Sequence, residues 1–397
     1  MNIHSTTGPH AAAHAITTRQ IAAGLLVGTI GVLTVGIQPI VLGELVDARQ
    51  VTLESVGIVA MGEIISLGLG VVVGDLLLPA SRLRLVTIVA ALLAAAFDLV
   101  TLRTSGDGQM LAVRVAAGLA EGMLVWSATG VVVRSANAAR VAGIFFVAQT
   151  LAQAALGAAL AHVVIPHAGW KGCFETLASL SLLPCAFAFV QPARLARRAP
   201  AAVSAFRWTV ATALPLLVAF LQLAALGSFW AYLEPLGRVA GFDARSAQTL
   251  VSGVLAMQVL GGSVATVAVR RLAAVPALVL SSAVLAAATL AAHALPAGWG
   301  APFALACALF GFTWLFMMPF QIDLALRADP SKRLAGLVPA AQLLGSAFGP
   351  LVASFVVKGD DAGAVPVLSA CFAVAAALLV LVSRRRLAIG AAGGLAR

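Results

Sequence analysis

The chain has 397 residues, of which 61% are hydrophobic and only 10% are charged, and its formal net charge is +10 at pH 7. An ordinary soluble domain has about 25% charged residues, so this composition excludes a soluble protein and indicates one that lies within a lipid bilayer. The excess of positive charge could indicate a nucleic-acid partner. However, the basic residues occur in short loops between apolar segments, so we predict that no nucleic acid is bound.

Breaks at glycine, proline and charged clusters divide the chain into twelve apolar segments. A transmembrane helix needs about 20 mostly apolar residues, and each segment is close to or above this length. The sequence therefore predicts an all-α integral membrane protein with twelve transmembrane helices. The predicted spans are 20–46, 54–78, 83–102, 109–133, 141–165, 170–190, 208–236, 246–269, 272–294, 299–325, 334–357 and 363–383.

The spans form two groups of six, separated by one basic segment. No cleavage site follows the first apolar run, so we expect the first span to be retained. The tail histidines and the four scattered cysteines lack the spacing of a metal or redox motif, so we predict no metal site and no cofactor. The predicted regions are a cytoplasmic N-terminal tail (1–19), an N-terminal six-helix bundle (20–190), a cytoplasmic linker (191–207), a C-terminal six-helix bundle (208–383) and a cytoplasmic C-terminal tail (384–397).

The basic residues predict on which side of the membrane each loop lies. If the N-terminus is inside the cell, 18 of the 25 lysines and arginines lie in cytoplasmic loops, six lie in outer loops, and Arg114 lies within a span. Cytoplasmic loops of membrane proteins carry such an excess of positive charge. The bias alternates from loop to loop. We therefore predict a bacterial inner-membrane protein with both termini in the cytoplasm.

The two groups of spans are similar in sequence. Residues 140–154 read RVAGIFFVAQTLAQA and residues 333–347 read RLAGLVPAAQLLGSA, with seven identities at a constant offset of 193. This similarity indicates a tandem duplication of six spans. Six spans in each repeat give the two bundles the same orientation in the membrane, and such folds hold their substrate between the bundles near the midplane.

The span 109–133 contains two charged residues, Arg114 and Glu121, which lie two helical turns apart on one face. A charge near the centre of a bilayer costs at least ~2.5–3.5 kcal/mol and is usually kept where it faces a cavity or a partner. Glu63, in the second span, is predicted to lie between them in depth. We hypothesise that Glu121 or Glu63 carries a coupling proton, and that Arg114 sets its affinity or binds an anionic substrate group. The alternative is a static ion pair that holds two helices together.

Other polar residues within the spans have simpler interpretations. Asp98 lies about one turn from the outer end of its span and close to Arg103, so we interpret these two residues as a surface pair at the membrane interface. Gln149 and Gln342 occupy equivalent positions in the two repeats, where a polar bond between helices is at least as plausible as contact with a substrate.

Short motifs in both halves match those of one transporter family. Each half has a glycine followed eight residues later by an arginine, although Leu78 and Pro79, and Thr266 and Val267, replace the acid–arginine pair that the family usually has between them. The chain resembles the major facilitator superfamily over essentially its whole length. The matching residues are Gly74 and Arg82; Gly262, Arg270 and Arg271; Arg114 and Gly118 in the fourth span; and the segment 169–174 before the sixth span.

The resemblance implies transport by alternating access, in which the two bundles rock about a substrate held between them. It also implies that spans one, four, seven and ten line the transport path. On these helices Gln38, Gln222 and Trp314 are candidates for contact with the substrate.

The same resemblance implies contacts between the bundles near the ends of the helices. Trp230 and Tyr232, at the outer end of span seven, are candidate gating residues, although an aromatic belt at the membrane interface also explains both rings. Arg82, Arg270 and Arg271 in the cytoplasmic loops are candidates for contacts between the bundles.

The sequence as a whole predicts a monomeric secondary active transporter that moves a small organic solute and is coupled to protons. The proton-driven multidrug or metabolite efflux pump is an alternative within the same fold, which the lack of a Gly-Pro motif in span five disfavours. A membrane-embedded enzyme would need clustered acids, histidines or a nucleophile, and a receptor would need a sizeable soluble domain. Sparse charges in an apolar cavity suit an amphipathic acid or a hydrophobic compound better than a sugar.

Overall fold

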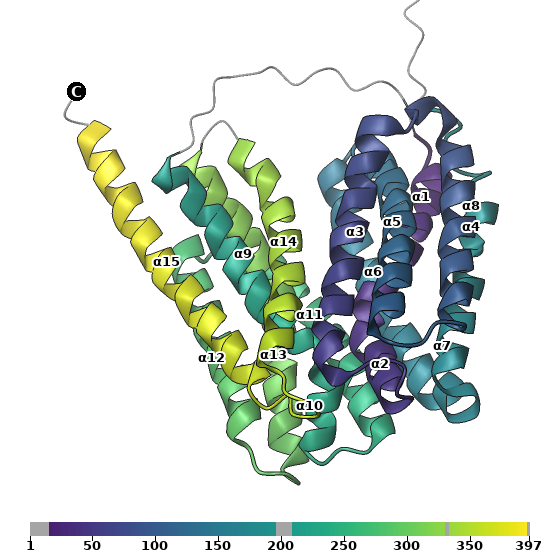
Figure 1. Cartoon of the computed structure of the whole chain (residues 1–397). Helices are drawn as coiled ribbons and strands as arrows, with labels where there is room; N and C mark the ends of the chain where they lie inside the picture. The colour runs from purple at the N-terminus through teal and green to yellow at the C-terminus, as the bar shows by residue number, and fades with distance from the viewer. Residues whose placement is uncertain (1–15, 196–208, 330–332, 395–397) are drawn as a thin grey trace, which may run out of the picture.

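The computed structural model describes residues 16–195, 209–329 and 333–394, and these ranges contain helices and no strand. Two helical bundles lie side by side (Figure 1). The first bundle contains α1 (Thr18–Gly31), α2 (Leu33–Asp47), α3 (Val56–Leu77), α4 (Leu83–Thr101), α5 (Asp107–Val132), α6 (Ala138–Ala159), the π-helical turn η3 (Leu160–Val164), α7 (Ile165–Ser181) and α8 (Leu183–Phe187). Two short 3-10 helices, η1 (Leu53–Ser55) and η2 (Ala80–Arg82), precede α3 and α4 in the first bundle.

The second bundle repeats the pattern of the first. The helices of the second bundle are α9 (Val210–Ala231), α10 (Leu233–Val239), α11 (Ala244–Ala268), α12 (Ala274–Ala294), α13 (Gly300–Ala328), α14 (Arg333–Val356) and α15 (Val365–Gly394).

These helices make twelve passes, which confirms the predicted all-α fold of twelve spans. The described residues contain 11 continuous helical stretches that are long and apolar enough to cross a membrane, and one of them, Arg140–Phe187, has 48 residues. A helix of that length would measure about 72 Å, more than twice the ~30 Å apolar thickness of a bilayer. Gly169 interrupts the stretch with φ 57°, a backbone conformation that favours glycine, so the stretch contains two passes.

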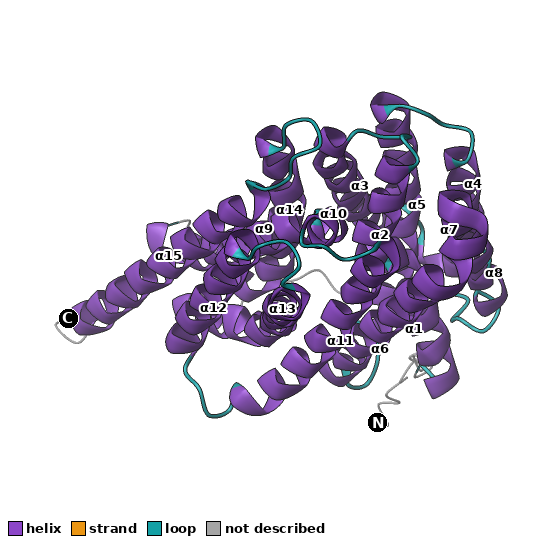
Figure 2. Ribbon diagram, turned by 90° about the horizontal axis from the view of Figure 1, so that it is seen from below, coloured by secondary structure: helices purple, strands orange, loops and turns teal. Residues whose placement is uncertain are grey.

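The first helix of each bundle is broken, after 14 residues in the first bundle and after 22 residues in the second. The break between α1 and α2 lies at Val32, and the break between α9 and α10 lies at Tyr232. We call the end of the molecule where α8 ends and α9 begins the linker side, which is uppermost in Figure 1, and we call the other end the opposite side. The segments after the breaks, α2 and α10, extend to the opposite side and pack together near the centre of the molecule (Figure 2).

Glycines allow the central helices of each bundle to pack closely. A Cβ atom at Gly122 of α5 would collide with the backbone carbonyl of Leu67 in α3, and one at Gly70 would collide with that of Leu119. In the second bundle, Gly261 of α11 and Gly311 of α13 make the same reciprocal contact. Small residues allow this close approach of helices in membranes.

We predict that Gly122→Ala lowers the stability of the protein by about 1–3 kcal/mol, because the added methyl group forces α5 away from α3. The thermal unfolding midpoint of the purified protein in detergent measures this effect. Gly253→Ala in α11 is the matched control, because a Cβ atom there meets no other atom within 4 Å. Equal midpoints for the two variants would contradict the proposed tight α3–α5 contact.

Candidate functional site

A buried charge cluster lies at the centre of the first bundle. The guanidinium of Arg114 on α5 forms ion pairs with Glu63 of α3, with Asp98 of α4 at 2.8 Å and with Glu121 of α5 at 3.5 Å. Each of the four side chains is at most 5% exposed. One positive group is therefore surrounded by three carboxyl groups in an apolar interior.

Further hydrogen bonds hold two of the carboxyl groups. The Gln38 amide donates to Glu63 Oε2 at 3.0 Å, and the Ser181 hydroxyl donates to Asp98 Oδ2 at 3.3 Å. Each oxygen of Glu63 and of Asp98 consequently has a partner.

Glu121 is bound less completely than the other two acids. Its Oε1 accepts a hydrogen bond from the Thr34 hydroxyl at 3.0 Å, and the contact of this atom with Arg114 is the longest of the three ion pairs. Its Oε2 is buried and has no hydrogen-bond partner within the part of the chain that the structure describes. A buried carboxylate oxygen without a donor is costly, whereas a protonated carboxyl group avoids that charge.

The structure places Asp98 and Gln38 differently from what the sequence predicted. Asp98 is only 1% exposed and binds Arg114, so its interpretation as a surface pair with Arg103 was wrong. Counting residues from the end of a helix gives depth but does not say which way the side chain faces. Gln38 is 1% exposed and faces Glu63 in the interior of the bundle. Nothing in the sequence singled out Thr34 or Ser181.

A cavity of about 200 Å³ lies between the two bundles. Trp314 and Trp230 form its aromatic corner, with ring centroids 5.5 Å apart and an interplanar angle of 87°. Ile64 and Leu67 of α3 line the cavity on the side of the buried charge cluster, and Arg114 is not among the lining residues. The cavity is lined by Val32, Val35, Gly36, Ile64, Leu67, Phe146, Gln149, Thr150, Gln153, Trp230, Leu255, Gln258, Trp314, Leu315, Met318, Leu343 and Ser346.

Gln222 lies inside the second bundle and does not line this cavity. Its amide donates to the Ser282 hydroxyl at 2.8 Å and accepts from the Gln321 amide at 2.8 Å. Gln342 in turn donates to Gln321 at 2.5 Å. This chain of neutral amides links α9, α12, α13 and α14, and it fulfils the expectation of a polar bond between helices at Gln342.

The cavity is closed on the opposite side by contacts from the broken helix of the second bundle. Pro39 in α2 has no N–H, so it leaves the carbonyl of Val35 without its helical donor. The indole N–H of Trp230 donates to this carbonyl at 3.3 Å. The N–H of Gly57, near the start of α3, donates to the Tyr232 hydroxyl at 3.0 Å. Both aromatic residues therefore join the bundles.

Charged and polar groups extend this closure toward the surface of the opposite side. The Gln248 amide of α11 donates to Glu44 of α2 at 2.6 Å, and Arg238 of α10 forms an ion pair with Asp47. Glu54 accepts a hydrogen bond at 2.7 Å from the N–H of Gly359, in the loop between α14 and α15.

The loop arginines of the sequence motifs lie on the linker side. Arg82 is exposed beside the start of α4, and Arg270 and Arg271 are exposed between α11 and α12. None of the three makes an ion pair or hydrogen bond through its side chain to another residue that the structure describes. Their contribution to contacts between the bundles remains a prediction.

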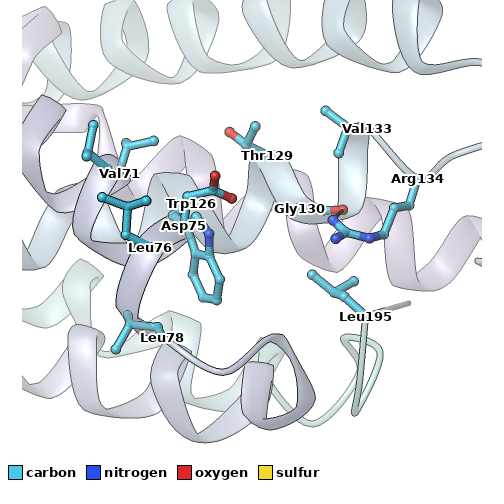
Figure 3. Close-up of a pocket in the computed structure, with 11 residues that line it drawn as sticks. Val71, Asp75, Leu76, Leu78, Trp126, Thr129, Gly130, Val133, Arg134 and Leu195 are labelled. Carbon is cyan, nitrogen blue, oxygen red and sulfur yellow. Dashed lines mark hydrogen bonds between the residues drawn. The ribbon is translucent and has the colours of Figure 1, made fainter. Parts of the chain in front are cut away.

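A second hollow, of about 600 Å³, lies on the linker side of the first bundle (Figure 3). Trp126, Asp75 and Leu195 are among the residues that line it, and Arg134 reaches back to the carbonyl of Gly130 at 2.9 Å. This hollow is larger than the cavity between the bundles, but residues of the first bundle and of the segment after α8 line it, whereas residues of both bundles line the cavity. We therefore take the cavity between the bundles as the candidate binding site.

The titratable residues that the structure describes form no cluster suited to a metal ion. No group of three or more histidine, cysteine, aspartate or glutamate side chains has the arrangement of metal ligands within residues 16–195, 209–329 and 333–383. In the charge cluster, the guanidinium of Arg114 occupies the place between the carboxyl groups where a cation would bind.

Comparison with known proteins gives a result only at the level of structure. No protein-family model matches the sequence, and no curated protein matches it. The nucleoside transporter NupG has a TM-score of 0.71 at 14% identity, over 92% of this chain and 99% of that chain. The chain has the major facilitator fold. The inward-open xylose transporter XylE from E. coli (TM-score 0.69, 14% identity, 91% of this chain and 96% of that chain) has the same fold.

A third structure supports the major facilitator fold. A bacterial homologue of the human lysosomal transporter Spinster, in an inward-facing and occupied conformation, has a TM-score of 0.65 at 14% identity, over 92% of this chain and 96% of that chain. The fold accounts for the two bundles of six passes with the same orientation and for a cavity between them.

We predict that Arg114→Met destabilises the protein by about 3–5 kcal/mol, because it leaves buried carboxyl groups without their cation. The free energy of unfolding in detergent checks this. Arg327→Met is the control, since Arg327 forms an exposed pair with Asp323 at 2.9 Å and should cost at most about 1 kcal/mol. The added substitution Glu63→Leu should recover part of the loss in a double-mutant cycle, and independent effects at 114 and 63 would contradict this coupling.

We also predict that Tyr232→Phe weakens the closure of the opposite side, because Gly57 loses its hydrogen-bond acceptor. One such bond is worth about 1 kcal/mol, which shifts the balance between closed and open states roughly fivefold. Distances between spin labels on Arg103→Cys and Lys358→Cys report this opening by electron spin resonance. An unchanged distance distribution would show that the Tyr232 hydroxyl does not hold the bundles together.

Proposed function

We propose that the protein is a secondary active transporter that moves a small organic solute across a bacterial inner membrane by alternating access, with a proton carried by Glu121. The major facilitator fold and the cavity between its bundles support the transporter. The buried Oε2 of Glu121, which lacks a donor among the described residues, is the observation that carries the proton assignment.

The charge balance of the cluster requires proton binding. Arg114 supplies one positive charge against the three carboxyl groups of Glu63, Asp98 and Glu121. An unpaired charge in a bilayer interior is expensive, so a cluster with three ionised carboxylates would hold excess negative charge at a large cost. Protonation of Glu121 reduces that excess and leaves the two well-bound carboxylates paired with the arginine.

Glu121 is connected to the wall of the cavity. Its Oε1 is bound by Thr34, which lies two residues after the break between α1 and α2 at Val32. Val32 and Val35 line the cavity, and the Gln153 amide donates to the carbonyl of Val32 at 2.6 Å. Loss of the proton would place a charge beside Arg114 and change the hydrogen bond to Thr34, so the position of α2 depends on the protonation state.

The direction of opening follows from the predicted topology. The contacts of Tyr232, Trp230 and Arg238 between the bundles lie on the opposite side, and the bundles diverge toward the linker side (Figure 1). The excess of positive residues predicts that the linker side faces the cytoplasm. The described conformation would then correspond to an inward-facing state, and rocking of the bundles would break the contacts on the opposite side.

We predict that Glu121→Gln abolishes proton-driven accumulation of solute while the protein remains folded in the membrane, because the amide cannot exchange a proton. Proteoliposomes loaded with the protein are given a mixture of small metabolites under a proton gradient, and their contents are compared by mass spectrometry. Glu175→Gln, an exposed acid at the opposite side, is the matched control. Accumulation by the Glu121→Gln variant at the wild-type level would show that Glu121 does not carry the coupling proton. Absence of accumulation by the wild type would contradict the proposed transport function.

A further inference from the structure

The cavity between the bundles has a lining that selects its ligand by charge. None of the residues that line it is aspartate, glutamate, lysine, arginine or histidine. The acids and the arginine of the first bundle bind one another behind α3, whose Ile64 and Leu67 face the cavity instead. An ionised ligand in the cavity would therefore have no side chain of opposite charge, and burial of such a charge is unfavourable.

Three glutamines line this uncharged cavity, and the amide of one of them, Gln153, donates to the carbonyl of Val32. Gln258 of α11 is 5% exposed, and Gln149 of α6 is half-buried. Both line the cavity, and neither side chain makes a hydrogen bond to another residue in the described part of the chain. Buried amides normally have partners, so two unpartnered amides at one cavity indicate a ligand that accepts and donates hydrogen bonds.

The packing of the two helices places these amides at similar depth in the molecule. Gly157 of α6 packs against Ser252 of α11, and the two helices run in opposite directions. Gln149 lies eight residues from Gly157, about 12 Å toward the linker side, and Gln258 lies six residues from Ser252, about 9 Å in the same direction. The two side chains thus approach the cavity at similar depth, one from each bundle.

The aromatic corner supplies the complementary apolar surface. Trp314 and Trp230 meet edge to face, and the indole N–H of Trp230 is already bonded to Val35. The indole N–H of Trp314 has no acceptor among the described residues and is a third polar group available to a ligand. The volume of about 200 Å³ is below the ~300–1,000 Å³ of pockets for drug-sized ligands, so a molecule with one small ring fits.

We infer that the cavity binds a small uncharged molecule with an apolar ring and an amide-like or hydroxyl group, held between Gln149 and Gln258 against Trp314. This inference rests on the proposed transporter function and narrows the predicted substrate class, because it excludes the amphipathic acid. Binding of the ligand by one glutamine from each bundle would also join the halves around it.

Phenylacetamide and phenylacetate test this inference, because the two probes have nearly the same shape and differ in charge at neutral pH. Calorimetric titration of the purified protein should show binding of phenylacetamide at least tenfold tighter than that of phenylacetate. Gln258→Leu and Gln149→Leu should each weaken phenylacetamide binding about tenfold, since a site with unpaired polar groups discriminates strongly. Gln109→Leu, at an exposed glutamine near the start of α5, should leave it unchanged.

Equal or tighter binding of phenylacetate, absence of phenylacetamide binding, or full binding by both leucine variants would each overturn the inference. These titrations use no proton gradient, so they are independent of the coupling role of Glu121. Proton-driven accumulation of carboxylates alone in proteoliposomes would leave the transporter standing while it refuted the uncharged ligand. Absence of any accumulation together with tight phenylacetamide binding would contradict the transport function and leave the uncharged ligand standing.

Discussion

The arrangement of one guanidinium among three carboxyl groups is the constraint on which the rest of the first bundle depends. Arg114 forms ion pairs with side chains of α3, α4 and α5 in an apolar interior. Buried charges of this kind are costly unless they are paired and their oxygens have donors. Gln38 and Ser181 provide donors for two of the acids, and we propose that a proton on Glu121 reduces the excess of negative charge. Stability and proton binding are thus consequences of the same geometry.

The two broken helices connect this cluster to the contacts between the bundles. The break at Val32 lies beside Thr34, which binds Glu121, and the break at Tyr232 places an aromatic hydroxyl against Gly57 of the other bundle. Pro39 frees a carbonyl that Trp230 of the second bundle then binds. Irregular backbone within a membrane persists where protein groups satisfy it. Here the satisfying groups come from both bundles, so the contacts that close the opposite side are the ones that rocking must break.

Most of the fold follows from local features of the sequence, and most of the site does not. Hydropathy is averaged over about 20 residues, so the twelve spans were predicted to within a few residues at most ends; α15, which continues to Gly394, is the main departure. The 3.6-residue period placed Arg114 and Glu121 on one face. Whether a polar side chain faces a cavity or its own bundle depends on helix rotation and on neighbours distant in sequence. Asp98 was misinterpreted for this reason, and Gln258 was not singled out.

The central claim is that Glu121 holds an exchangeable proton in this cluster, and infrared spectroscopy of the purified protein tests it without knowledge of the substrate. A protonated carboxyl group has a carbonyl-stretching band that a carboxylate lacks. The account predicts such a band from a buried group, which disappears as the pH is raised, is missing in Glu121→Gln and persists in Glu175→Gln. A titrating band of unchanged intensity in Glu121→Gln, or none in the wild type, would contradict it.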